Sequence, residues 1–384
     1  MTAGTRHRGI LGAQYFLYFG VMGMHLPFFN LYCYEIGFSG WQIGALSAAR
    51  SVVLVLFSLF WSFLADRFQA RRSIYLLCNF LAAALWALFL LTADFWWMLA
   101  ITIVHGIFYA PLIAFLEAFA MAALGRDKKR YGRMRAWGSL AFILVVLTLG
   151  RAIDAYGVRI ILSLILAGSW LQMAVALGFP RGGRRETRSP GSWRALLTPR
   201  VILFLFCAFL MLLSHGAYYT FFSIHLATLG YDSFFIGICW AVAVAAEISA
   251  MVFSERLFQR FRYESVLIVS FAVAVLRWAG LWGAESAAAL IALQATHAIT
   301  YGTFHMASIL YIDALAPPEA KTVGQAANNA VTYGLGLMAG FFLSGALHEY
   351  IGAQGLFAIS AAVALVGGAV FAAYSRLQQN EATH

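Results

Sequence analysis

Residues 116–137 read LEAFAMAALGRDKKRYGRMRAW, and this stretch decides how the chain is organised. It leaves one apolar segment, passes through a basic hairpin and enters the next apolar segment. Glu117 lies in the first segment, about two helical turns before the hairpin, and Arg135 opens the second. A carboxylate in hydrocarbon costs ~2.5–3.5 kcal/mol on insertion scales. Glu117 is therefore expected to face a polar interior, with Arg135 as its partner.

The composition of the whole chain excludes a soluble globule. Of 384 residues, 62% are hydrophobic and 11% are charged, whereas soluble domains carry ~25% charged residues. The chain is therefore expected to be an all-α membrane protein in a lipid bilayer. The net charge of +10 lies mainly in short loops between apolar segments, which indicates membrane topology rather than binding to nucleic acid.

Twelve apolar stretches are long enough to cross a bilayer, which takes ~20 residues each. They form two sets of six, separated by a linker rich in Gly, Pro and Arg. The sequence predicts an N-terminal half at 1–180, a linker at 181–200 and a C-terminal half at 201–384. The stretches are 10–34, 41–64, 73–92, 96–123, 137–154, 159–179, 201–229, 234–257, 265–283, 287–315, 326–348 and 352–374.

The basic residues lie almost entirely on one side of the predicted membrane. Nearly all Lys and Arg fall in one set of loops, and the opposite loops hold only Arg151 and Arg159. The positive-inside rule then places both termini and the linker in the cytoplasm. The expected location is the inner membrane of a bacterium.

The loop LADRFQARRS at 64–73 resembles the signature loop of the major facilitator superfamily. That family consists of two six-helix halves that rock about a site at the membrane midplane. Asp66, Arg67, Arg71 and Arg72 are expected to form a clasp of charges at the cytoplasmic face. A basic loop that only sets topology is the alternative, but topology alone needs no carboxylate. The similar runs GFSGWQIG (37–44) and GYDSFFIG (230–237) also support two repeated halves.

The opening stretch is also similar to the lactose permease group within that superfamily. The run YGRMRAWGS at 131–139, preceded by LEAF, carries this resemblance. It implies that Glu117 and Arg135 hold the substrate and that Phe142 replaces a stacking Trp of the group.

The predicted C-terminal half carries further matches to the lactose permease group. Glu247, Arg277 and His297 fall where the group has residues that couple transport to protons. Thr300 and Tyr333 stand where the group has a carboxylate and a lysine. The resemblance therefore implies proton coupling through a site in which some of the group's charged residues are replaced.

The resemblance is closer to the phenylpropionate permease branch. It rests on GAYYTFFS within 201–229, on RWAG within 265–283, on the paired histidines His297 and His305, and on Arg50. It implies a proton-coupled importer of a small substrate such as an aromatic carboxylate.

The residues themselves also indicate a polar interior. His297, Tyr301 and His305 recur every four residues and share one helical face of ~12 Å. A histidine in hydrocarbon needs a hydrogen-bond partner, so lining of a polar site and packing in the core are about equally favoured for each one. His105 stands alone and is expected to be a packed structural residue.

Two arginines near the middle of predicted helices need anions, because a guanidinium does not lose its proton. Arg50 is expected to meet either a protein carboxylate or the substrate. Glu247 is the expected partner of Arg277, and this ion pair could be purely structural.

These observations predict a proton symporter in which an anionic substrate competes for an arginine and releases a carboxylate to take up a proton. The predicted proton-coupling residues are Glu247, Arg277, His297 and His305. The predicted substrate-binding residues are Glu117, Arg135, Arg50, Phe142, Tyr218, His25 and Asn328.

Other classes of protein remain as alternatives. The same charges fit a proton-coupled sugar or nucleoside symporter, a proton-driven exporter or a sensor that does not transport. No HExxH, GxSxG or GxxxxGK[ST] run is present, so enzymatic activity and ATP use are not expected. The expected partners are a small-molecule substrate and protons, with no cofactor and no metal, in a monomeric protein.

Overall fold

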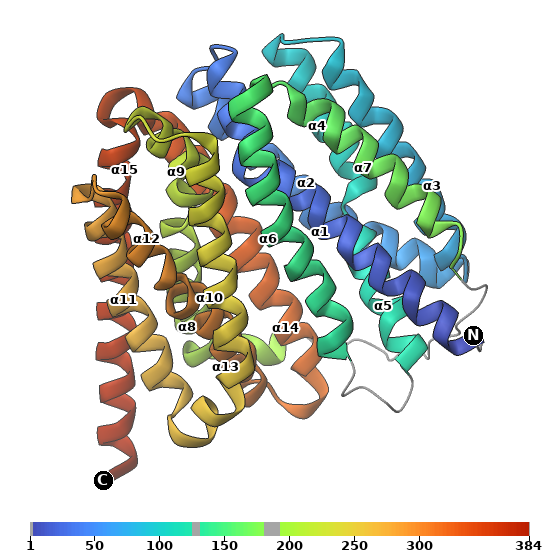
Figure 1. The fold of residues 1–384 in the computed structure, drawn as a ribbon. Helices are drawn as coiled ribbons and strands as arrows, with labels where there is room; N and C mark the ends of the chain where they lie inside the picture. Colours follow the sequence, from blue (N-terminus) through green and yellow to red (C-terminus); the bar gives the residue numbers. More distant parts are fainter. Residues whose placement is uncertain (1–2, 125–130, 180–192, 384) are drawn as a thin grey trace. The chain divides into compact units, whose positions relative to one another are not determined.

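The computed structural model describes residues 3–124, 131–179 and 193–383, and every element in these ranges is a helix (Figure 1). The predicted all-α class is confirmed. Eight helices are long and apolar enough to cross a membrane by length and composition. Each predicted span falls on helical residues, although several spans are divided into shorter helices. The basic hairpin at 125–130 and residues 181–192 of the predicted linker lie outside the described residues.

The first six predicted spans contain seven α-helices. Asp94 begins one of them by accepting hydrogen bonds from the N–H groups of Trp96 and Trp97. The predicted span 96–123 is divided at Pro111, which has no N–H to continue the helical ladder. The helices are α1 (Ala3–Glu35), α2 (Gly40–Arg67), α3 (Arg71–Trp86) with the 3₁₀ turn η1 (Ala87–Leu90), α4 (Phe95–Tyr109), α5 (Leu112–Leu124), α6 (Tyr131–Tyr156) and α7 (Ile160–Ala176).

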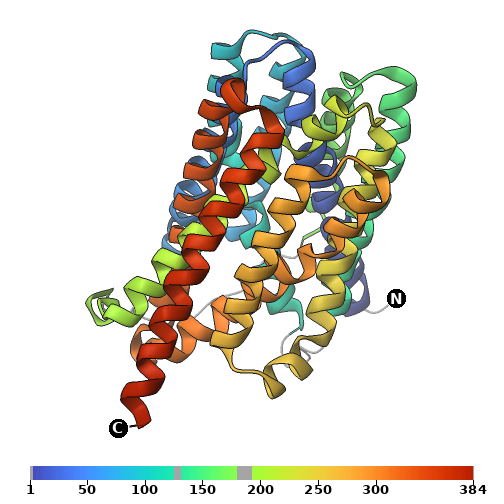
Figure 2. The same ribbon diagram turned by 90° about the vertical axis from the view of Figure 1, so that its left-hand side faces the viewer.

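The last six predicted spans are divided more often. The end of the eleventh span and the whole of the twelfth lie in α15, which consists of two helices that meet at a kink and of which Figure 2 shows the second running to the C-terminus. The chain turns within it at Gly352, whose φ of 67° is easily reached only by glycine. The elements are η3 (Trp193–Leu196), α8 (Pro199–Ser214), α9 (Gly216–Thr228), α10 (Ser233–Arg260), α11 (Tyr263–Gly283), α12 (Ala287–Ala295), η4 (Ala298–Thr303), α13 (Phe304–Leu315), η5 (Pro318–Ala320), α14 (Lys321–Asn329), η6 (Ala330–Gly336) and α15 (Leu337–Thr383).

Two of these elements, η4 and η6, are π-helical. They interrupt the predicted spans 287–315 and 326–348. A π-helical turn bonds residue i to i+5 and occurs frequently at functional sites. The apolar pattern of the sequence gives no sign of either segment, because a π turn does not change which residues are apolar.

The chain divides into two compact units. They follow the predicted halves, except that the first turns of α2 belong to the second unit and those of α10 to the first. The exact boundaries at 1–180, 181–200 and 201–384 stay a prediction. The first unit is Met1–Phe38, Ala49–Thr187 and Gly230–Ala241, and the second is Ser39–Ala48, Arg188–Leu229 and Val242–His384.

Close glycine contacts explain why these first turns group as they do. A Cβ on Gly44 would lie 2.6 Å from Cα of Gly345, within the second unit. A Cβ on Gly237 would lie 2.3 Å from the carbonyl oxygen of Val146, within the first unit. Only glycine lets the backbones approach so closely. The two glycines end the similar runs 37–44 and 230–237, which supports the predicted repeat.

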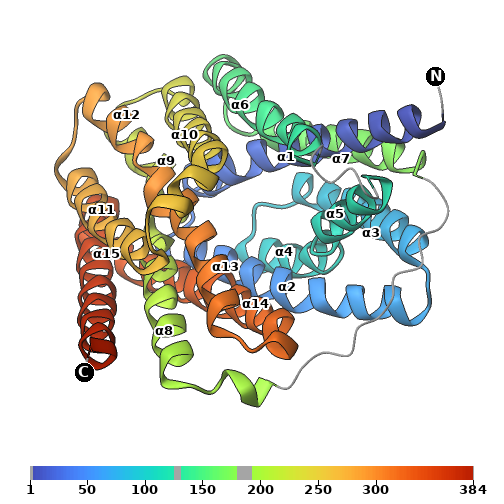
Figure 3. The ribbon, with the colours of Figure 1, turned by 90° about the horizontal axis from the view of Figure 1, so that it is seen from below.

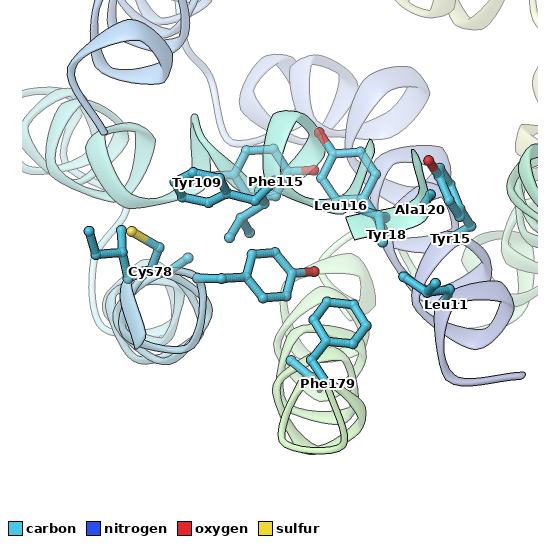
Figure 4. Close-up of a cluster of buried hydrophobic side chains, with 14 of the residues drawn as sticks. Leu11, Tyr15, Tyr18, Cys78, Tyr109, Phe115, Leu116, Ala120 and Phe179 are labelled. Atoms are coloured by element: carbon cyan, nitrogen blue, oxygen red, sulfur yellow. The ribbon is translucent and has the colours of Figure 1, made fainter. Parts of the chain in front are cut away.

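The core of the first unit is largely aromatic. Tyr75 of α3 stacks on Phe179 with ring centroids 5.1 Å apart, and the Tyr75 hydroxyl accepts a hydrogen bond from Gln14 of α1 at 2.8 Å. In a bilayer such packing and hydrogen bonding, rather than water exclusion, hold helices together. Figure 4 shows part of this core, with Leu11, Tyr15, Tyr18, Cys78, Tyr109, Phe115, Leu116, Ala120 and Phe179 labelled.

In the second unit, α15 packs along α8, α9 and α11, and Figure 3 shows α11 and α15 side by side. Gly216 at the start of α9 meets α15 directly, because a Cβ there would lie 2.3 Å from the carbonyl carbon of Gly340. This contact fixes α9, which carries Tyr218, against the helix behind it.

Candidate functional site

The second unit contains a completely buried arginine, Arg277 of α11. Its Nη1 lies 2.6 Å from Nδ1 of His297 and donates to Oγ1 of Thr300 at 3.0 Å. Its Nη2 donates to Oε1 of Gln294 at 3.0 Å. The three acceptors follow each other at intervals of three residues along the end of α12 and the start of η4, so they share one face toward Arg277.

Aromatic rings complete the surroundings of this arginine. Its guanidinium carbon lies 4.4 Å from the ring centre of Tyr218 and 4.8 Å from that of Trp278, both within cation–π range. The Tyr218 hydroxyl donates to Oε1 of Gln294 at 3.0 Å. We call the six residues of this group the Arg277 cluster; they are Arg277, Gln294, His297, Thr300, Tyr218 and Trp278.

The expected ion pair between Arg277 and Glu247 is not formed. The hydrogen-bond partners of Arg277 are Gln294, His297 and Thr300, all neutral acceptors. Glu247 of α10 lies against η4 instead, with its Cγ 3.4 Å from where a Cβ on Gly302 would be. The expectation failed because the neutral side chains facing Arg277 already occupy its Nη donors.

A row of rings extends along η4 into α13. His297 stacks on Tyr301 with centroids 5.0 Å apart, and Tyr301 stacks on His305 at 6.1 Å. These residues share one face, as their spacing predicts. Nδ1 of His305 lies 2.7 Å from the hydroxyl of Tyr333, which links α13 to the π-helical segment η6.

The first unit contains the other intramembrane arginine, Arg50 of α2. Its Nη1 is hydrogen-bonded to the ring of His25 on α1. The guanidinium carbon lies 5.7 Å from the ring centre of Tyr109 on α4. Gly106, one residue after His105, lets α4 approach α2, because a Cβ there would lie 3.0 Å from Val53.

Four rings contact each other in order, and the first and the last of them, His25 and Tyr109, both contact Arg50. His25 lies 5.5 Å from Trp86, Trp86 lies 5.3 Å from His105, and His105 stacks on Tyr109 at 5.4 Å. Trp86, His105 and Tyr109 are buried, whereas Arg50 and His25 are only half-buried. We call these five residues the Arg50 cluster. His105 is packed as predicted, but it is not isolated.

No carboxylate among the described residues neutralises Arg50. The ionisable groups that interact with its charge are His25, His105, Tyr18 and Tyr109. Its hydrogen-bond partner in the described part of the chain is the His25 ring. A guanidinium carries five N–H donors, so Arg50 has donors left for an anion.

The expected direct ion pair between Glu117 and Arg135 is also not formed. Glu117 accepts a long hydrogen bond of 3.5 Å from the hydroxyl of Tyr131. The guanidinium carbon of Arg135 lies 3.8 Å from the ring centre of Phe19. That ring fits against α6 because Gly138 has no side chain, and a Cβ there would lie 2.4 Å from it. Stacking on Phe19 therefore takes the place of the ion pair, although Arg135 remains within electrostatic range of Glu117.

Two other predicted substrate-binding residues are deeply buried. Phe142 is 2% exposed and packs against Gly23 of α1, at 3.3 Å from where a Cβ would be. Asn328 of α14 is 1% exposed, and neither of its side-chain amide atoms has a hydrogen-bond partner in the described part of the chain. A buried amide without partners is costly, so Asn328 is a better candidate for binding a substrate than Phe142.

One ion pair of the predicted clasp, Asp66 with Arg71, is formed within the first unit. Asp66 accepts hydrogen bonds from Nε and Nη2 of Arg71. Arg72 donates to two backbone carbonyls just after α7, at 2.7 and 2.9 Å, where an Arg is favourable at a helix C-terminus. Arg67 is exposed. The loop therefore does more than set topology.

Sequence analysis missed Gln294, Trp86 and Tyr109. Gln294 could have been found, because it lies three residues before His297 on the same helical face. Trp86 and Tyr109 carry no comparable signal. They join the Arg50 cluster only through contacts between side chains of different helices: Trp86 meets His25 and His105, and Tyr109 meets Arg50.

Long apolar helices that enclose ionisable groups are typical of membrane transporters. The model of the MFS_1 like family matches residues 10–359. The chain belongs to this family, which is part of the major facilitator superfamily. It is a multi-pass membrane transporter and not an enzyme.

Relatives and a solved structure agree with this assignment. The chain is 32% identical over 372 residues to the probable 3-phenylpropionic acid transporter of Escherichia coli (strain K12), covering 92% of this chain and 94% of the relative. It is 24% identical over 352 residues to the maltose permease of Geobacillus stearothermophilus, covering 89% of each. The crystal structure of the nucleoside transporter NupG matches with a TM-score of 0.84 at 18% identity, over 95% of this chain and 98% of that chain. This likeness confirms the predicted fold.

Proposed function

We propose that the protein is a proton-coupled symporter of a small organic acid, such as an aromatic carboxylate, that works by alternating access. The transporter role follows from the family to which the chain belongs. The identity of 32% to a probable 3-phenylpropionic acid transporter supports an aromatic acid as substrate. The distribution of Lys and Arg supports cytoplasmic termini, and we place the protein as a monomer in a bacterial inner membrane.

The observation that carries the substrate class is the absence of carboxylates around the two intramembrane arginines. In the described part of each unit, the side chains that contact Arg50 or Arg277 are imidazoles, neutral polar groups and aromatic rings. A cation in hydrocarbon without a counter-charge is costly. A substrate that carries a negative charge would supply what the protein lacks, whereas a neutral substrate would not.

For the proton we assign Glu247 as the carrier, together with His297 and His305. Glu247 lies against Gly302 of η4, a residue between these two histidines in the chain. A proton on Glu247 would remove a charge from the membrane interior before the conformational change. Substrate and proton would then cross together, because each lowers the cost of carrying the other's charge through hydrocarbon.

Uptake into proteoliposomes tests this proposal. With acid outside, wild-type protein is expected to accumulate radiolabelled 3-phenylpropionate above its external concentration. Glu247→Gln should lose this accumulation but retain exchange of labelled for unlabelled substrate, because exchange needs no net proton movement. Glu255→Gln is the matched control, since Glu255 is exposed near the end of α10.

Three results would contradict parts of this proposal. No accumulation by the wild-type protein would exclude symport of this acid. Loss of substrate from preloaded vesicles would indicate export. Full accumulation by Glu247→Gln would show that another group carries the proton.

A proton-coupled sugar or nucleoside symporter is the second candidate. The maltose permease relative favours it, and so does the unpaired amide of Asn328, which could bind a substrate hydroxyl. Thermal shift of detergent-purified protein with aromatic carboxylates, sugars and nucleosides at pH 5.5 and 7.5 separates the two candidates. Stabilisation by sugars or nucleosides alone would favour the second.

A further inference from the structure

The two units offer three arginines to an anionic substrate, Arg50 of α2, Arg135 of α6 and Arg277 of α11, and the surroundings of the three differ. We propose that the substrate carboxylate binds Arg50, that the Arg50 cluster receives an aryl monocarboxylate, and that Arg135 does not hold the carboxylate. This inference rests on the proposed function, because it names the residue and the ligand class for the same transport reaction.

Arg50 has the donors that a carboxylate needs. Of its guanidinium nitrogens, only Nη1 is hydrogen-bonded within the described part of the chain, and its partner is the ring of His25. Nε and Nη2 lie side by side on the guanidinium and can bind both oxygens of one carboxylate. Arg50 and His25 are also only half-buried, unlike Arg277, so the cluster is not sealed from its surroundings.

Arg277 does not have the same capacity. It is completely buried, and its Nη1 and Nη2 donate to Gln294, His297 and Thr300. A carboxylate at Arg277 would have to displace these acceptors, and buried groups without partners are costly. Arg277 therefore organises the interior of the second unit.

Arg135 is already engaged by other groups. Its guanidinium lies over the ring of Phe19 at 3.8 Å, and Glu117 is within electrostatic range. An anionic ligand at Arg135 would meet the negative charge of Glu117, which opposes binding. Arg50 has no carboxylate in its surroundings within the described ranges.

The rings around Arg50 define the rest of the ligand. His25, Trp86, His105 and Tyr109 lie 5.3–5.7 Å from their neighbours in the Arg50 cluster, within the 4.5–7 Å range typical of aromatic pairs. An aryl group next to the carboxylate would make contacts of the same kind. A second carboxylate would lie among these rings without a second cation, which is costly. The chemistry of the cluster therefore favours a ligand with one charge and one ring.

Binding of a matched acid and amide to the purified full-length protein tests this inference. The probes are 3-phenylpropionate and 3-phenylpropionamide, which differ mainly in charge. Wild-type protein is expected to prefer the acid by about tenfold or more, because hydrogen bonds to charged groups are the strong ones. Arg50→Gln should abolish this preference, whereas Arg50→Lys should retain part of it, because lysine keeps the charge but not the paired donors.

Two control variants make the result specific. Arg376→Gln should keep the full preference, since Arg376 is exposed near the end of α15. Arg135→Gln should keep it as well. Retained preference in Arg50→Gln, or its loss in Arg135→Gln alone, would overturn the inference and leave the proposed function intact. A wild-type protein that binds neither probe but binds a sugar or nucleoside would overturn both.

A second measurement uses only the wild-type protein, so its result does not depend on whether Arg50→Gln folds. Phenylglyoxal modifies accessible arginines, and mass spectrometry of peptides locates the modified residues. The acid should protect Arg50 from modification, whereas the amide should protect it less. Equal modification of Arg50 with and without a saturating concentration of the acid would overturn the inference.

Discussion

The Arg50 and Arg277 clusters are built from the same chemical pair, an arginine bonded to a histidine inside a membrane span, yet their surroundings differ. Arg277 is 0% exposed, with three hydrogen-bond partners and two aromatic faces. Arg50 is half-buried, with one hydrogen-bond partner and one aromatic face. The difference teaches that an arginine in a membrane is not by itself a binding residue. What matters is how many of its donors the protein already uses.

The largest expected effect is on the stability of an Arg277→Leu variant. Removing the guanidinium leaves the buried acceptors of His297 and Thr300 without this donor, at about 1–3 kcal/mol for each unpaired group, and leaves Gln294 with only the Tyr218 hydroxyl. We expect several kcal/mol of lost stability, seen as a large drop in melting temperature. Thermal unfolding can be followed with a thiol-reactive dye, because Cys33, Cys78, Cys207 and Cys239 are free and buried. An unchanged melting temperature would show that the hydrogen bonds of Arg277 do not stabilise the protein. The two clusters would then not differ in their contribution to stability.

A smaller loss is expected for Gln294→Leu. Oε1 of Gln294 accepts from both Arg277 and Tyr218, so its removal leaves two donors with fewer partners. The expected cost is about 1–3 kcal/mol, measured in the same dye assay. Gln294→Glu serves as the control, because it keeps an acceptor for Arg277 and should lose less. Equal losses in both variants would show that the shape of Gln294, rather than its oxygen, is what the cluster needs.

The smallest effect on stability is expected for Arg50→Leu. This change removes a cation that has no counter-charge among the described residues and one hydrogen bond to His25. The two contributions oppose each other, so the stability should change by no more than about 1 kcal/mol, the typical worth of one hydrogen bond. The melting temperature checks this directly. A loss as large as that of Arg277→Leu would mean that Arg50 is structural, and the proposed carboxylate site would lose its main argument.

The sequence predicted the helices well, because long apolar runs separated by basic loops leave few alternatives. It did not predict where the spans divide. The break at Pro111 follows from local chemistry, since proline removes a helical hydrogen bond. The π-helical segments η4 and η6 depend on packing in the folded unit and leave no mark in the apolar pattern.

The candidate site was predicted as a set of charges, not as a set of contacts. Arg50, His25, Arg277 and His297 were identified because ionisable groups are rare in spans. The ion pair of Arg277 with Glu247 was wrong, because the sequence does not show that neutral side chains compete for the same donors. Any contact between residues on different helices depends on packing that a single sequence does not reveal.

The π-helical segment η4 has a consequence for how this chain can change in evolution. Four residues of a regular α-helix turn by about 400°, so residues at that spacing drift by ~40° per step. An i→i+5 turn holds more residues, and across this segment His297, Tyr301 and His305 stack with their rings 12° and 10° from parallel. Deleting one residue from 298–303 would let the π turn close to regular α geometry and would change the spacing of four residues that places His297, Tyr301 and His305 in one stack. Descendants that keep the ring stack must therefore inherit the length of this segment as strictly as its residues.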